Sequence, residues 1–103
     1  MNKDITIGGL VAAGFDASGS YLLTITHSGR GVFSTLTWDR IARDHSVVYP
    51  ENGTAIGIGP VIGQTIPITE MDYEKGVMYL KSPDGRISLK CESDSISVQV
   101  SDA

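Results

Sequence analysis

The sequence predicts an all-β domain in which a mostly antiparallel meander forms a small sandwich or a partial barrel. Three observations lead to this prediction. Stretches such as 21–26 and 32–37 are rich in the β-branched and apolar residues that suit a pleated surface. Apolar and polar residues alternate at 87–91 and again at 96–101, which is typical of half-buried strands. Glycine accounts for 12 of the 103 residues and can supply tight turns between these stretches.

Two hairpins are the clearest elements. The first spans 21–37 and turns at Ser28–Gly31, where glycines tolerate positive φ. The second spans 77–91 and turns at Ser82–Gly85, where proline sets φ and glycine takes a positive φ. Alternation along the second hairpin predicts that the side chain of Cys91 points inward.

Three further stretches are predicted to be extended but interrupted. The segment 5–13 forms one or two strands with a bulge or bend at Gly8–Gly9. At 54–59 isoleucine alternates with glycine, so one face of that strand is bare and another backbone or a ligand could approach it. The segment 64–69 is a candidate strand in which Pro67 lies at a sheet edge or a bend, because proline cannot donate a ladder hydrogen bond.

The segment 38–43 has two interpretations. Thr37 could cap a short helical turn with Asp39 in its first turn. Alternatively, a turn at 37–39 leads into a strand from Arg40 to Asp44 with Ile41 and Arg43 on one face. We favour the strand, because so short a helix needs tertiary support and the preceding segments already form a meander. At most one short helical turn is expected in the chain.

Composition and charge limit the function classes. The chain is short enough for a single domain, 1–103. Its net charge is −4, and its eight basic residues are scattered, so neither nucleic acid nor a membrane surface is an expected partner. No stretch approaches the length of a membrane span, and the N-terminus lacks the unbroken apolar run of a signal peptide. Because the single cysteine, Cys91, fits a reducing compartment, we expect a cytoplasmic protein.

The stretch from Asp16 to Gly29 contains Asp-x-x-Gly, an apolar strand and a short glycine turn, and a similar turn occurs at Ser82–Arg86. This pattern resembles one blade of a β-propeller of the WD40-like kind. The resemblance implies repeats in which a short glycine turn joins two strands. A propeller needs at least about four blades of about 40 residues, and this chain is too short to close one. The expected outcome is therefore a meander that closes as a sandwich, a partial barrel or a dimer.

The sequence contains no recognisable catalytic or metal-binding motif. His27 and His45 lack partners at the spacings of known metal sites, so we expect no metal and no cofactor. Gly57–Gly63 is rich in glycine like a phosphate-binding loop, but Pro60 and Gly63 break the helix that such a loop must open. The interpretation of the protein as an enzyme is the less favoured one. In that interpretation a pocket forms near Gly57–Gly63, with Gly57 and Gly59 in its wall and with His27 or His45 beside an aspartate.

The leading hypothesis is a small non-enzymatic protein-binding or assembly module that associates with a protein partner or with itself as a dimer. Aromatic and arginine side chains favour such contacts, and they gather at or near predicted turns. The candidate contact residues are Trp38, Arg40, Arg43, Tyr49 and Tyr73. The alternative is a small enzyme or ligand-binding protein with the glycine pocket. A third hypothesis is an accessory protein whose acidic surface meets a basic target.

Overall fold

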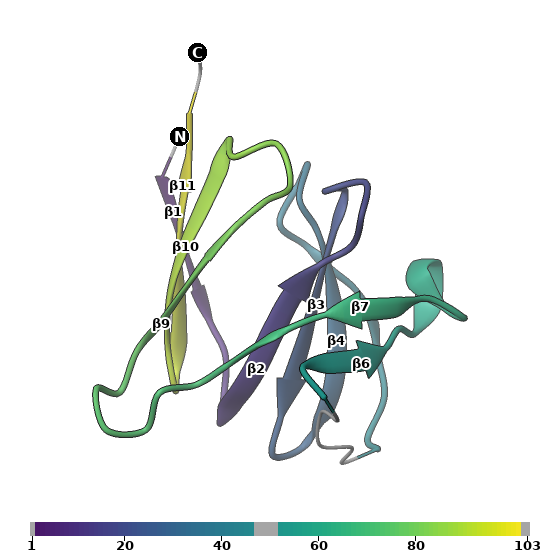
Figure 1. Ribbon diagram of the computed structural model, residues 1–103, viewed down its shortest axis with the longest axis horizontal. Coiled ribbons are helices and arrows are strands. Elements are labelled where there is room, and N and C mark those ends of the chain that lie inside the picture. The colour runs from purple at the N-terminus through teal and green to yellow at the C-terminus, as the bar shows by residue number, and fades with distance from the viewer. Residues whose placement is uncertain (1, 47–51, 102–103) are drawn as a thin grey trace.

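The protein is all-β and consists of two antiparallel sheets and a two-stranded ribbon (Figure 1), seen in a computed structural model that describes residues 2–46 and 52–101. The fold class predicted from the sequence is thus confirmed. The strands are β1 (Asn2–Thr6), β2 (Leu10–Phe15), β3 (Tyr21–Thr26), β4 (Gly29–Ser34), β5 (Arg40–Arg43), β6 (Thr54–Ile56), β7 (Thr65–Pro67), β8 (Thr69–Glu70), β9 (Met78–Lys81), β10 (Ile87–Glu92) and β11 (Ser95–Val100). A 3-10 turn, η1 (Gly59–Val61), lies between β6 and β7.

The strand order shows how the two ends of the chain meet. One sheet has the order β1-β11-β10-β9, so the first strand completes a sheet made by the last three. The other has the order β5-β4-β3-β2-β8, and β6 pairs with β7 in the ribbon. Neither large sheet closes into a barrel, and the two open sheets share one buried core.

The bend predicted at Gly8–Gly9 carries the chain from one sheet to the other. Gly9 has φ of 63°, a left-handed conformation that glycine adopts at little cost. Backbone hydrogen bonds from Ile7 to Asp94 and from Leu10 to Ser93 hold this crossing against the β10–β11 turn. The segment 5–13 therefore contributes two strands to two different sheets, one of the two forms predicted for it.

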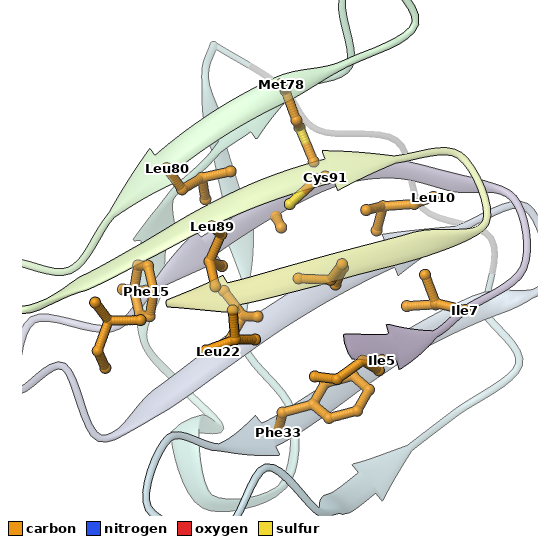
Figure 2. Packing of buried hydrophobic residues seen from close by; sticks show 14 of the residues in the cluster. Ile5, Ile7, Leu10, Phe15, Leu22, Phe33, Met78, Leu80, Leu89 and Cys91 are labelled. Carbon is orange, nitrogen blue, oxygen red and sulfur yellow. The ribbon is translucent and has the colours of Figure 1, made fainter. Parts of the chain in front are cut away.

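The main core lies between the two sheets (Figure 2). Inward residues of β9, β10 and β11 alternate with exposed ones, as the sequence pattern predicts. Cys91 lies in this core with no exposed surface, so the inward orientation predicted for it is confirmed. Figure 2 shows its sulfur among apolar side chains of both sheets, with Leu10, Met78 and Leu89 labelled nearby.

A second core lies on the opposite face of the five-stranded sheet. Val61 of η1 and Ile66 of β7 are buried there against Leu23, Ile25 and Val32. The arm that contains β6, η1 and β7 therefore forms a third layer, and Figure 1 shows it beside β3 and β4. This layer explains why every residue of β2 is buried and why the strand shows no alternation.

The interrupted stretches resolve as follows. The segment 64–69 forms two short strands, β7 and β8, and Pro67 lies at the end of β7 in the two-stranded ribbon, the edge position expected of proline. The segment 38–43 forms the strand β5, as favoured, and the short helical turn lies instead at η1. Among the described residues, no helix has the length and hydrophobicity needed to cross a bilayer.

Candidate functional site

Two of the predicted contact residues, Arg40 and Arg43, lie side by side on β5. The register pairs Arg40 with Phe33 and Arg43 with Gly31, and directly paired residues of antiparallel strands share a face. Residues three apart in a regular strand point to opposite faces, but a register shift between Val32 and Phe33 inserts one extra residue into β5. The bulge therefore places Arg43 on the same face as Arg40.

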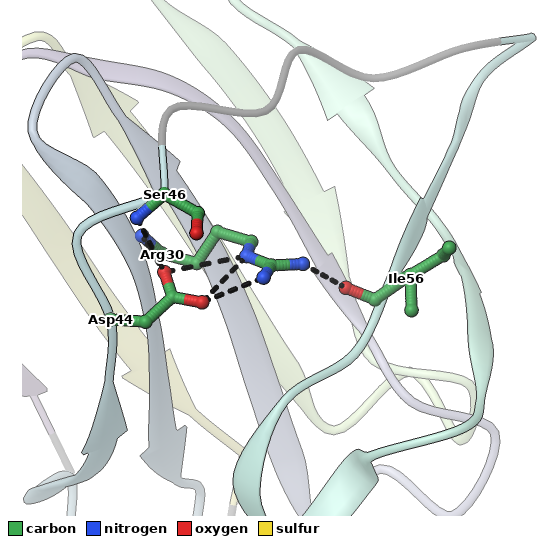
Figure 3. A network of polar contacts seen from close by, with 4 residues as sticks. All are labelled: Arg30, Asp44, Ser46 and Ile56. Carbon is green, nitrogen blue, oxygen red and sulfur yellow. Dashed lines mark hydrogen bonds and ion pairs between the residues drawn. The ribbon is translucent and has the colours of Figure 1, made fainter.

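Next to these arginines, Arg30 of β4 is tied to Asp44 just beyond β5 (Figure 3). Arg30 Nε and Nη2 donate to Asp44 Oδ2 at 3.1 and 2.6 Å, and Arg30 Nη1 donates to the carbonyl of Ile56 at 3.2 Å. The backbone N–H groups of Arg30 and Ser46 also donate to Asp44 Oδ1. The side-chain hydrogen bond from Arg30 is the main cause that lowers the pKa of Asp44.

A small cavity of about 110 Å³ opens beside these side chains. It is lined by Arg30, Arg40, Arg43 and Asp44, by the hydroxyl residues Thr24, Thr26 and Ser28, and by Ile7, Gly8, Gly29 and Gly31. We call it the arginine cavity. It has three guanidinium groups and one carboxylate, and Arg30 already neutralises that carboxylate. The arginine cavity therefore carries a positive charge in a protein whose net charge is negative.

The predicted aromatic contact residues do not gather around the arginines. Trp38 is buried, with 4% of its surface exposed, and has a positive φ of 63°. It packs in the main core, and its indole nitrogen has no hydrogen-bond partner in the described residues. Tyr73 is 69% exposed and lies in the turn before β9. Tyr49 lies outside the described residues.

The predicted glycine pocket is occupied by the protein's own chain. A side chain at Gly57 would approach the carbonyl oxygen of Val61 to 2.3 Å, and one at Gly59 would approach the methyl group of Ala42 to 2.4 Å. The strand predicted at 54–59 ends at Ile56, so Gly57 and Gly59 lie beyond it and form no bare strand face; they allow close internal packing instead. His27 and His45 are exposed, and within the described residues no hydrogen bond joins either one to these glycines or to a carboxylate.

The free edge of β9 is not indicated by the sequence pattern. Ser82 N–H donates to the carbonyl of Ile87 on β10 at 3.0 Å, and Leu80 pairs with Leu89. Because backbone groups alternate in direction along a strand, those of Tyr79 and Lys81 point away from β10. No described residue bonds to them. A groove of about 430 Å³ lies beside the strand, and its other walls are the segments 14–17 and 64–69.

The other sheet edges are less open to pairing. β5 carries a bulge and two arginines, and β8 has only two residues. On β1, Lys3 lies on the same face as the buried Ile5 and reaches the carbonyl of Thr37 at 3.4 Å. Short strands, bulges and inward charges are devices that block edge-to-edge pairing.

Catalytic chemistry finds little support in the described part of the chain. No group of three or more histidine, cysteine, aspartate or glutamate side chains there lies close enough to hold a metal ion. Burial raises the pKa of the Cys91 thiol to about 12, so at neutral pH it is not a thiolate nucleophile. Comparisons of the chain with family models, with curated proteins and with solved structures give no match.

Proposed function

We propose that the protein is a small non-enzymatic assembly module that associates with a second copy of itself through the free edge of β9. The observation that carries this proposal is the pair of residues, Tyr79 and Lys81, whose backbone groups point away from β10 without a partner. An unpaired strand edge is a template for another strand. The other edges of the two large sheets are short, bulged or carry an inward charge, which leaves β9 as the preferred position for pairing with another strand.

The free edge of β9 is complementary to itself. If two copies meet antiparallel about a twofold axis at Leu80, Tyr79 of each copy faces Lys81 of the other. Each such pair exchanges two N–H to carbonyl hydrogen bonds, so the contact has four. A lysine opposite a tyrosine avoids the repulsion that two lysines would create. Leu80 itself is 8% exposed and stays in the core.

Light scattering after size-exclusion chromatography tests the proposal. We expect the mass to rise from 11.0 kDa toward twice that value as the concentration reaches about 0.5 mM. Tyr79→Pro removes an outward N–H while leaving the hydrogen bonds to β10 in place, and should give a folded monomer. Tyr79→Thr keeps that N–H and is the matched control, which should still dimerise. A wild-type protein that stays monomeric at this concentration refutes self-association.

The proposed location is the cytoplasm. It rests on the lone thiol of Cys91, which is buried and unpaired in the described structure. A thiol of this kind is stable in a reducing compartment.

A further inference from the structure

We infer that the arginine cavity binds a small oxyanion, a phosphate or carboxylate group, between Arg40 and Arg43. This inference is independent of self-association through β9. The first step is geometric: the β5 bulge brings the two arginines onto one face, and Gly31, which pairs with Arg43, presents no side chain on that face. A methyl group at Gly31 would lie 3.4 Å from Arg40 Nε.

The second step concerns charge. Within residues 2–46 and 52–101 the ion pair of Arg30 with Asp44 is the only one, so no described carboxylate lies within 4 Å of Arg40 or Arg43. The guanidinium of Arg40 lies over the ring of Phe33, 5.2 Å from its centroid, which fixes its direction without neutralising it. Asp44 is held by Arg30 and by two backbone N–H groups, so it does not compete for the other arginines.

The third step concerns size and donors. The cavity, of about 110 Å³, has room for an oxyanion group. Guanidinium groups bind carboxylate and phosphate with paired, charge-assisted hydrogen bonds. Ser28 adds a hydroxyl to the cavity wall, whereas the hydroxyls of Thr24 and Thr26 donate to the carbonyls of Gly31 and Gly29. The ligand is therefore an oxyanion, free or at the end of a larger molecule.

The test is an NMR titration of the full chain that follows the arginine Nε–Hε and the Gly31 amide resonances. Potassium phosphate and potassium acetate are added separately, each against potassium chloride at the same ionic strength. We expect saturable shifts, with a dissociation constant of about 1–10 mM for phosphate, acetate or both. The salt that saturates identifies the phosphate or the carboxylate form of the ligand. Absence of saturation with both salts overturns the inference.

Three variants make the test specific. The double variant Arg40→Gln with Arg43→Gln should weaken oxyanion binding at least about tenfold, because both guanidinium groups are lost. Lys75→Gln with Lys90→Gln removes the same charge from exposed positions away from the cavity and should leave binding unchanged. Gly31→Ala keeps every charge but places a methyl group in the cavity, and should also weaken binding.

Equal weakening by the arginine and lysine pairs would mean nonspecific screening and would overturn the inference. Circular dichroism checks that each variant is folded.

Discussion

Leu22 and Leu23 give a direct test of the three-layer architecture. They are consecutive residues of β3, so their side chains point to opposite faces of the sheet. In a two-layer sandwich one of them would face water. Here neither has any exposed surface, because Leu22 packs in the main core and Leu23 packs under the β6–η1–β7 arm. Truncation of either side chain should therefore be costly.

The expected magnitude follows from complete burial. Leucine-to-alanine substitution at a fully buried site costs about 2–5 kcal/mol, the lost transfer free energy plus the cavity left behind. We expect Leu22→Ala and Leu23→Ala each to lose about 3 kcal/mol, a large part of the roughly 5–15 kcal/mol that stabilises a domain of this size. Leu36 is 88% exposed, so Leu36→Ala should change the unfolding free energy by less than about 0.5 kcal/mol.

Urea denaturation followed by the fluorescence of Trp38 measures these differences. Trp38 is the single tryptophan of the chain and is buried, so its emission should change when the protein unfolds. The three variants should unfold with the same dependence on urea concentration as the wild type, but at different midpoints. If Leu23→Ala costs no more than Leu36→Ala while Leu22→Ala costs about 3 kcal/mol, the second core is not a packed layer and our reasoning fails.

Three further predictions concern single sites. Asp44→Asn should cost about 1 kcal/mol at pH 7, and this difference should shrink below pH 4 in urea titrations, because Arg30 lowers the native pKa from 3.8 and the stabilisation is lost as pH falls through it. Cys91 should not react with Ellman's reagent at pH 8 unless urea unfolds the protein, and rapid native reaction would contradict its burial. Gly57→Ala should lower the melting temperature by about 10 °C through the clash with the Val61 carbonyl, and an unchanged melting temperature would contradict that close approach.

Sequence patterning predicts the part of the fold in which one face of each strand meets water. The hairpin at 77–91 and the final strand alternate clearly, and the structure has β9, β10 and β11 there. Proline and glycine mark the turn at 82–85 because they set the backbone angles that the turn requires. In this sheet local chemistry and burial agree, so the elements follow from the sequence alone.

The same logic fails where both faces are buried. β2 reads Leu-Val-Ala-Ala-Gly-Phe, with no polar residue to indicate which side faces water. Its pairing with β3 is shifted by a bulge after Leu10, which lets Val11 and Ala12 face the same second core. A bulge of this kind depends on contacts across strands that local sequence does not encode. The third layer could not be predicted for the same reason.

The candidate site shows the same division. Arg40 and Arg43 can be selected from the sequence as contact residues, but their shared face depends on the bulge in β5. Trp38 can be identified from the sequence as an aromatic residue near a turn. In the structure that turn directs the side chain inward, because the backbone N–H of Trp38 donates to the carbonyl of Ser34 at 2.7 Å and its φ is positive. The free edge of β9 left no signal in composition, because an unpaired strand has the same pattern as a paired one.

The two proposed contacts lie on opposite sides of the sandwich and differ in chemistry. β9 is the last strand of one sheet and β5 is the outer strand of the other. The β9 edge offers unpaired backbone groups and one charged side chain, Lys81, whereas β5 offers two arginines on a bulged strand that cannot easily accept another strand. In our two proposals the bulge and the arginines have separate consequences: they disfavour strand pairing at β5, and they leave β5 free to hold an oxyanion. A dimer formed through β9 would therefore carry two separate arginine cavities.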